Sequence, residues 1–182
     1  MKRVFWAVFA GTAAVYAAMI LWSIPKITVS SEGESLLPFD LRPFGYDFTA
    51  AHAYLEALTA DATASYLGLQ HTFDMFFPAL VATTVALATL LLSPVSWGFA
   101  RWMLALIVLP GMVFDYCENA AVAAMLAAGA SGLTPDLAIR ANGFTVLKSA
   151  FNALSMAIVL VMIANHLVRR FRRNRTPTQE PS

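Results

Sequence analysis

The chain has 182 residues, of which 59% are hydrophobic and only 13% are charged, with a formal net charge of +1. This composition lies outside the range of soluble globular domains and is typical of an integral membrane protein, for which we expect no nucleic-acid partner. The single cysteine, Cys117, excludes an internal disulfide bond and a multi-cysteine metal site.

Four apolar stretches are each long enough to cross a hydrocarbon core of about 30 Å as a helix of about 20 residues. They predict an all-α, polytopic membrane protein with four transmembrane helices in a bundle. We expect one transmembrane domain over residues 1–170 and a disordered, basic cytoplasmic tail over residues 171–182. The predicted spans are residues 4–23, 71–92, 102–128 and 144–168.

The first span follows Lys2 and Arg3, as the apolar core of a secretory signal would. Its apolar run exceeds the roughly 7 to 15 residues of a typical signal core, so we interpret it as a retained anchor, with cleavage as the alternative. Ala10, Ala14 and Ala18 recur at every fourth position. Such spacing of small residues predicts close contact with a neighbouring helix.

The long loop after the first span is predicted to be partly helical. Asp47 or Thr49 can cap a short helix. Thr59 or Asp61 can cap a second helix, which then continues directly into the second span. We expect the proline-bearing segment LLPFDLRPFGY to form an extended connector or to fold over the mouth of the bundle.

Lysine and arginine are distributed unevenly around the four spans. Positively charged flanks stay on the cytoplasmic side, so both termini are predicted to be cytoplasmic, and residues 25–70 and 129–142 to face outward. The cytoplasmic set is Lys2, Arg3, Arg101, Arg169, Arg170, Arg172, Arg173 and Arg175, against Lys26, Arg42 and Arg140 outside.

Polar side chains that hydrocarbon disfavours occur in three of the four spans. Each charged one costs about 3 kcal/mol near the bilayer centre if unpaired, so we expect these side chains to point inward and meet. Within each helix they are three or four residues apart and share one face. A rise of about 1.5 Å per residue places them in the outer half of the membrane. The predicted cluster is His71, Asp74, Asp115, Glu118, Asn119, Lys148 and Asn152, in which Lys148 pairs with Glu118 or Asp74.

Three segments carry a family resemblance: PFGYDFTAAHAYLEAL, YLGLQHTFDMFFPAL and DYCENAAV, together spanning residues 43–122. In them the chain resembles a group of small four-helix bacterial membrane proteins without an assigned activity. The most specific elements are Asp74 and the triplet Asp115, Glu118 and Asn119. The resemblance implies the architecture and a location in the bacterial inner membrane, and it transfers no catalytic role.

Several sharper kinds of site are excluded by spacing. The three histidines do not meet at one depth, which excludes a bis-histidine haem, and the Glu-x-x-His pairs of a di-iron bundle are missing. No nucleophile elbow, zincin motif or phosphate-binding glycine loop occurs. A metal held by His71, Asp74 and Glu118 is disfavoured because Lys148 would repel the ion. We therefore predict no metal and no cofactor.

The polar cluster allows interpretations of different classes. The favoured one is a structural cluster that joins the helices through hydrogen bonds, or an accessory site for a lipid-like small molecule from the outer leaflet. Its partners would be membrane lipids, an amphipathic ligand or another membrane protein. The alternatives are acid–base catalysis by Asp115 and Glu118, and proton or ion translocation. Translocation is disfavoured because the inner half offers only Asn165 and His166 as a continuing polar path.

Overall fold

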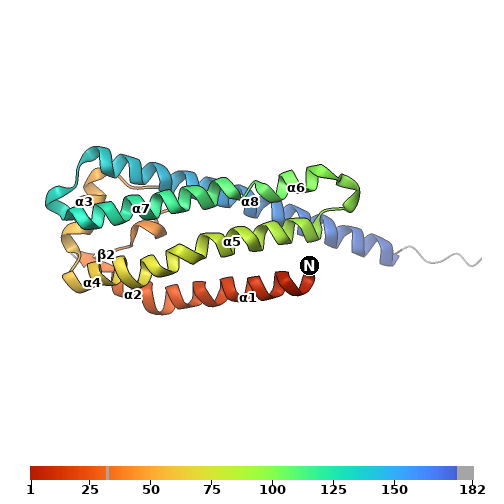
Figure 1. The fold of residues 1–182 in the computed structure, drawn as a ribbon, viewed down its shortest axis with the longest axis horizontal. Coiled ribbons are helices and arrows are strands. Elements are labelled where there is room, and N and C mark those ends of the chain that lie inside the picture. Colours follow the sequence, from red (N-terminus) through yellow and green to blue (C-terminus); the bar gives the residue numbers. More distant parts are fainter. Residues whose placement is uncertain (32, 176–182) are drawn as a thin grey trace, which may run out of the picture.

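The computed structural model describes residues 1–31 and 33–175, most of which are helical. Four helical stretches in this part of the chain are long and apolar enough to cross a membrane, which confirms the predicted all-α architecture. These stretches are Lys2–Ile27, Ala60–Leu92, Phe99–Gly132 and Pro135–Phe171. They run side by side, and the N-terminus lies at the same end of the bundle as the far end of α8 (Pro135–Arg175) (Figure 1).

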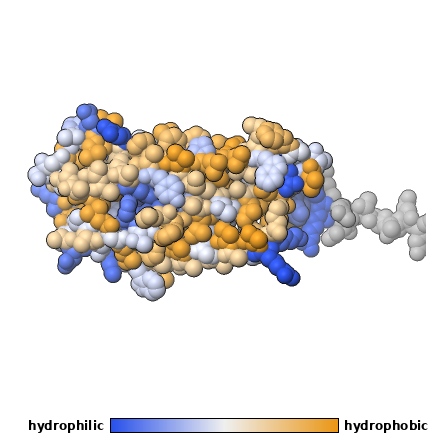
Figure 2. Space-filling view, viewed as in Figure 1, coloured by the Kyte–Doolittle hydropathy of each residue, from blue (hydrophilic) through white to orange (hydrophobic). Residues whose placement is uncertain are grey.

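Most apolar side chains on these helices face outward. In the most apolar window of each stretch, only 6% to 28% of the residues are buried inside the bundle. Large exposed side chains include Trp6, Phe76 and Leu160. Hydrophobic residues cover much of the visible face along its length, while hydrophilic residues lie mostly toward its two ends (Figure 2). An apolar surface of this extent fits a hydrocarbon environment rather than water.

The first stretch packs along the second. It consists of α1 (Lys2–Ala18), a π-helical turn η1 (Met19–Ser23) and α2 (Ile24–Ile27). Ala10 and Ala14 are exposed, so the prediction that these small residues form the helix contact is wrong. The contact is made by a neighbouring face, where the Thr12 hydroxyl lies 2.8 Å from that of Thr84 on α5 (His71–Leu92). This pair of hydroxyls provides an interhelical hydrogen bond that an alanine seam would lack.

The segment between the first two spans folds into a cap at one end of the bundle (Figure 1). Both predicted helix starts are confirmed, because Asp47 accepts a hydrogen bond from Ala50 N at 2.7 Å and Thr59 accepts one from Ala62 N at 3.2 Å. The second cap helix continues through the π-helical turn η3 (Tyr66–Gln70) into α5, as predicted. The cap elements are β1 (Val29–Ser31), β2 (Glu34–Leu36), the 3-10 turn η2 (Phe39–Leu41), α3 (Phe48–Ala57) and α4 (Ala60–Ser65).

The antiparallel β1–β2 hairpin is an element that the sequence patterns did not predict. Its strands are too short to show alternation, and Gly33, with a φ of 86°, is the only local turn signal. The segment after it forms the cover rather than the extended connector, since η2 turns inward and Phe39 is fully buried.

The third span is divided by a turn at residues 107–108 into α6 (Phe99–Leu106) and α7 (Leu109–Gly132). Pro110 lies in the first turn of α7, where its missing N–H removes no helical hydrogen bond. Within α7, Gly129 has a φ of 64° and interrupts the helical geometry, next to the predicted end of the span at residue 128.

The fourth span begins earlier than predicted. Thr134 accepts a hydrogen bond from Leu137 N at 3.3 Å, and Pro135 suits the first helical turn. Helix α8 therefore already includes most of residues 129–142, which were predicted to lie outside the fourth span and to face outward. At its other end α8 runs to Arg175, into the segment predicted to be a disordered tail, and residues 176–182 lie outside the described residues.

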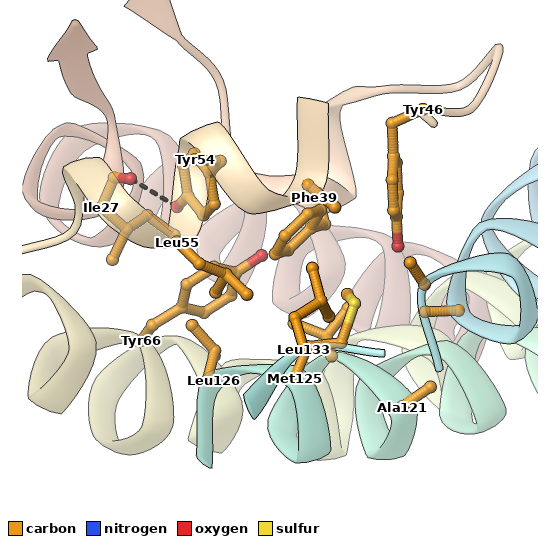
Figure 3. Close-up of a cluster of buried hydrophobic side chains, with 14 residues drawn as sticks. Ile27, Phe39, Tyr46, Tyr54, Leu55, Tyr66, Ala121, Met125, Leu126 and Leu133 are labelled. Atoms are coloured by element: carbon orange, nitrogen blue, oxygen red, sulfur yellow. Dashed lines mark hydrogen bonds between the residues drawn. The ribbon is translucent and has the colours of Figure 1, made fainter. Parts of the chain in front are cut away.

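The main hydrophobic core lies between the cap and the adjoining parts of α7 and α8. The ring centroids of Phe39 and Tyr54 are 4.8 Å apart, and the Tyr54 hydroxyl donates a 2.6 Å hydrogen bond to the Ile27 carbonyl (Figure 3). The core therefore holds the cap against the membrane-spanning helices. Its buried members are Ile27, Phe39, Tyr46, Ala51, Tyr54, Leu55, Tyr66, Ala121, Val122, Met125, Leu126, Leu133, Ala138 and Ala141.

Candidate functional site

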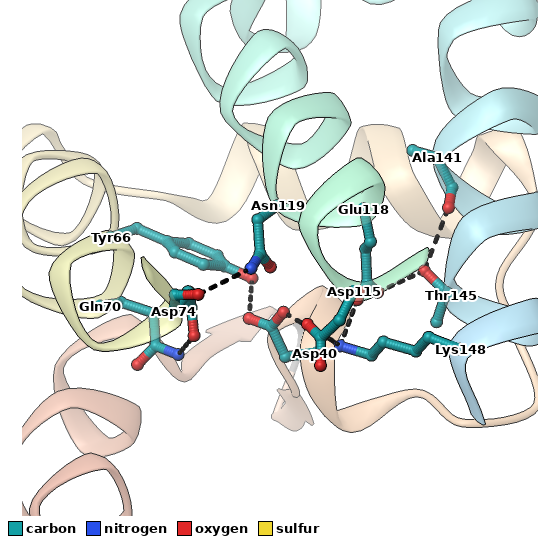
Figure 4. Close-up of polar contacts among 10 residues, drawn as sticks. All are labelled: Asp40, Tyr66, Gln70, Asp74, Asp115, Glu118, Asn119, Ala141, Thr145 and Lys148. Atoms are coloured by element: carbon teal, nitrogen blue, oxygen red, sulfur yellow. Dashed lines mark hydrogen bonds and ion pairs between the residues drawn. The ribbon is translucent and has the colours of Figure 1, made fainter. Parts of the chain in front are cut away.

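Charged side chains from α7 and α8 meet directly beneath the cap (Figure 4). The ammonium group of Lys148 lies 3.4 Å from Asp115 Oδ1 and forms an ion pair with Glu118 Oε2. The Lys148 side chain is only 12% exposed and that of Glu118 is fully buried. Because Asp115 and Glu118 are three residues apart, one face of α7 presents both carboxylates to the same lysine.

Glu118 is held on both carboxylate oxygens. Lys148 pairs with Oε2, and the Thr145 hydroxyl donates to Oε1 at 2.5 Å. The same hydroxyl lies 3.1 Å from the Ala141 carbonyl oxygen, one turn earlier on α8. Thr145 thus ties α7 to α8 and satisfies a carboxylate that has no access to water. Both oxygens of Glu118 are therefore engaged by α8, and its side chain has no exposed surface.

A third carboxylate comes from the cap, and the sequence analysis missed it. Asp40, on η2, places Oδ1 3.7 Å from Lys148 Nζ and accepts a 2.8 Å hydrogen bond from the Tyr66 hydroxyl at Oδ2. Asp40 lies outside the predicted spans, so a search for charges within them could not include it. The available signal was its position in the segment LLPFDLRPFGY, which was proposed as a cover over the bundle mouth.

The neighbouring Arg42 fixes the position of this segment. Its guanidinium donates two hydrogen bonds to the Leu37 carbonyl, at 2.9 and 2.7 Å. It also lies over the rings of Phe39, Tyr46 and Tyr54, with centroid distances of 5.3 to 5.8 Å. Burial lowers the pKa of Arg42 from its ordinary value and raises the pKa values of Tyr46 and Tyr54. The contacts of Arg42 thus lie within the cap, and Lys148 is the cation that pairs with the buried carboxylates.

The cap is also tied to α8 on the other side of Asp40. The Tyr46 amide donates a 2.8 Å hydrogen bond to Asn142 Oδ1. The preceding Gly45 has a φ of 90°, and a Cβ at this position would stand 2.3 Å from the same Asn142 oxygen. The close approach of the cap to α8 therefore requires glycine here, for both its backbone conformation and its lack of a side chain.

Asp74 does not join the ion pairs of Lys148, so that alternative of the predicted pairing is wrong. Its carboxylate accepts a 2.8 Å hydrogen bond from Gln70 Nε2, one turn earlier on the same continuous helix. Asn119 Nδ2 donates at 3.2 Å to the backbone carbonyl of Asp74, which links α7 to α5. Asp74 thus has a hydrogen-bond partner in the neutral amide of Gln70 on its own helix. Lys148 forms its ion pairs with the carboxylates of α7 and of the cap instead.

His71 and Asn152, the other two residues of the predicted cluster, have no hydrogen bond to it among the described residues. His71 lines a side opening of about 250 Å³ between α5 and α7, together with Asp74, Tyr116 and Asn119. Asn152 lies against Gly111, where a Cβ would stand 2.5 Å from Asn152 Oδ1. Of the predicted cluster, Lys148, Asp115 and Glu118 form a central group, Asp74 and Asn119 form a separate contact between α5 and α7, and His71 and Asn152 lie at the margins.

A cavity of about 260 Å³ lies between α5, α7 and α8 on the side of the cluster away from the cap. Asp115, Asn152 and Ser155 provide its polar wall, and the rest is apolar, including Phe77, Val81, Ala82 and Met112. Asp115 therefore has two environments, since it contacts Lys148 on one side and the cavity on the other. It is the carboxylate of the central group that can also reach a molecule in the cavity.

The group around Lys148 can accept hydrogen bonds or protons from a bound molecule. Three carboxylates, those of Asp40, Asp115 and Glu118, lie within 3.7 Å of one ammonium group. A positively charged or hydrogen-bond-donating ligand group would be favoured next to this excess of acids. Among the described residues, no group of three or more histidine, cysteine, aspartate or glutamate side chains is placed to hold a metal ion.

Comparison of the chain with protein-family models, curated proteins and solved structures finds no match.

Proposed function

We propose that this protein is a multi-pass protein of the bacterial inner membrane with both termini in the cytoplasm. Support comes from the excess of lysine and arginine at the end that carries the N-terminus and the far end of α8 (Figure 1). The cap would then face the periplasm. The bacterial location follows the sequence resemblance described above.

A reporter that is active only in the periplasm tests this orientation. Fused in the hairpin near Glu34, it should be active, and fused after Ser182, it should be inactive. The reverse pattern would contradict the proposed orientation.

We further propose that the protein binds a lipid-like amphipathic molecule within the membrane. The observation that carries this proposal is the cavity of about 260 Å³ that has Asp115 in its wall. Its volume lies just below the range of roughly 300 to 1,000 Å³ that is common for small-molecule sites. An apolar part of the ligand would lie against Phe77 and Met112, and a polar group would reach Asp115 and Asn152.

The ion pairs around Lys148 indicate which polar group of a ligand would bind at Asp115. Asp115 is oriented by Lys148, and Lys148 is itself held by Glu118 and Asp40. The acceptor is thus preorganised by ion pairs on the side away from the cavity. A hydroxyl or amino group of the ligand would donate a hydrogen bond to Asp115 without displacing Lys148. The apolar part of the ligand would fill the apolar part of the cavity.

The proposal is tested by identifying what co-purifies with the protein in nanodiscs, using native mass spectrometry followed by lipid analysis. We expect a bound amphipathic molecule. Ala82→Leu places a larger side chain in the cavity and should remove this molecule. Ala79→Leu is the control, because the same change one turn earlier on α5 lies outside the cavity lining. Equal occupancy in the two variants would contradict the proposal.

Acid–base catalysis by Asp115 is a second candidate, favoured by the position of its carboxylate between Lys148 and the cavity. Asp115→Asn keeps the shape and most hydrogen-bonding capacity while removing the titrating group. Under the binding function this variant should retain the co-purifying molecule, with changed affinity. Under the catalytic function it should accumulate unconverted substrate. If Asp115→Asn and Glu118→Gln both leave bound molecule and cellular phenotype unchanged, the cluster is structural only.

A further inference from the structure

A second and larger space lies at the opposite end of the bundle from the cap. It is a groove of about 610 Å³ between α1, α5 and α8, walled by Phe5, Phe9, Leu91 and Ile163 among others. Val85 and Met156 line both this groove and the smaller cavity, so they stand between the two spaces. The groove has the volume of an ordinary small-molecule site, and its walls are almost entirely apolar.

The open end of this groove is basic. Lys2 and His166 line it, and Arg169 lies with His166 in an adjoining recess of about 60 Å³. All three residues are exposed. No aspartate or glutamate occurs in residues 1–31, 75–114 or 137–179, which provide the helices around this end. The groove therefore combines an apolar interior with a positively charged mouth that lacks acidic neighbours in sequence.

We propose that this groove is a binding site for an anionic phospholipid. Its phosphate would be held by Lys2, His166 and Arg169, and one acyl chain would lie between α1 and α8. If the bundle crosses the bilayer, an apolar groove along its helices would be filled by hydrocarbon chains, and the positive charge at its mouth would select an anionic head group. This assignment to a leaflet rests on the proposed orientation: with both termini in the cytoplasm, the lipid would belong to the cytoplasmic leaflet.

This site differs from the proposed site beneath the cap in both location and ligand charge. The mouth of the groove is positively charged and favours an anion, whereas the cluster around Lys148 has an excess of carboxylates and favours a cationic or neutral group. Loss of one site would leave the other intact, so the two proposals fail independently.

A lipid titration of the delipidated protein, followed by native mass spectrometry, tests the proposal. The two lipids are phosphatidylglycerol and phosphatidylethanolamine with the same acyl chains. Phosphatidylglycerol should bind more tightly at low salt. Lys2→Ala combined with Arg169→Ala should weaken its binding about 25-fold, because each basic residue near an anionic head group contributes about fivefold. The control is Lys26→Ala with Arg140→Ala, which removes the same charge near the cap and should have little effect.

A second variant tests the groove itself. Ala88→Phe fills the groove from α5 and should lower the affinity for phosphatidylglycerol, whereas Ala86→Phe, outside the groove lining, should not. Equal binding of the two lipids, equal losses in the two charge variants, or no difference between the two phenylalanine variants would overturn the proposal.

Discussion

The two halves of this bundle are built in different ways. Beneath the cap, aromatic and aliphatic side chains form a buried core, and Lys148, Glu118 and Asp40 form a buried ion-pair network. The half that carries the N-terminus has exposed apolar side chains, such as Trp6, and a groove of about 610 Å³ between its helices.

The difference shows which forces order each half. Side-chain packing and ion pairs specify the cap half in the way that they specify a soluble domain. In the other half, the apolar faces of the helices have few protein partners, and association depends on limited contacts such as that of Thr12 with Thr84. Substitutions should therefore have large effects beneath the cap and small ones near the termini.

The largest effect is expected from Lys148→Met, which leaves buried carboxylates without their cation. We expect a loss of about 4 kcal/mol in the free energy of unfolding, because breaking one side of a buried ion pair leaves an uncompensated charge. Adding Glu118→Gln should recover part of this loss. Reversible unfolding in mixed micelles measures it, with exposed Arg170→Met as the control. A double variant no better than the sum of the two single variants would show that the residues are not coupled.

Phe39→Ala should have the next largest effect, because Phe39 is fully buried and packs on Tyr46 and Tyr54. We expect the free energy of unfolding to fall by about 3 kcal/mol, because apolar burial is lost and a cavity remains. Phe9→Ala is the matched change in the other half, where the side chain is 44% exposed within the bundle, and it should cost much less. Similar losses for the two variants would remove the proposed difference between the halves.

Gly45→Ala and Gly33→Ala compare two positive-φ glycines of the cap. Both substitutions impose a left-handed conformation on alanine, at a cost of about 1 kcal/mol. At Gly45 the added Cβ would also meet Asn142, whereas at Gly33 nothing lies within 4 Å. Gly45→Ala should therefore lower the unfolding temperature more than Gly33→Ala. An equal change would mean that the contact between the cap and α8 contributes nothing beyond the backbone conformation.

The smallest effect concerns alkaline pH and Tyr54. Burial raises the pKa of the Tyr54 phenol above its ordinary value of about 10, so the folded state holds this proton more tightly than the unfolded state. Its contribution to stability is complete below pH of about 10 and declines as pH rises toward the raised pKa. Tyr54→Phe removes the hydrogen bond to the Ile27 carbonyl and should lower the free energy of unfolding by about 1 kcal/mol at neutral pH. The free energy of unfolding of the variant should then fall less between pH 9 and 11 than that of the unsubstituted protein. An unchanged alkaline profile would contradict this.

Local sequence patterns were sufficient for the elements that depend on local physics. The lengths of the apolar runs predicted the four spans, and the short-range hydrogen bonds of Asp47 and Thr59 predicted two helix starts, because each involves residues close together in the chain. The three-residue spacing of Asp115 and Glu118 likewise predicted that one face of α7 presents both carboxylates.

Tertiary packing decided the rest, since it depends on contacts between distant residues. Asp40 reaches Lys148 only because the cap folds over the bundle around Phe39 and Arg42, which no local pattern encodes. Asp74 was expected to compete for Lys148 but is satisfied by Gln70, and Asn152 lies beside the cavity instead of joining the network. Hydrophobicity and helical period determine which helices can cross a membrane and which residues share a face, whereas the partners of a buried charge depend on how separate segments pack.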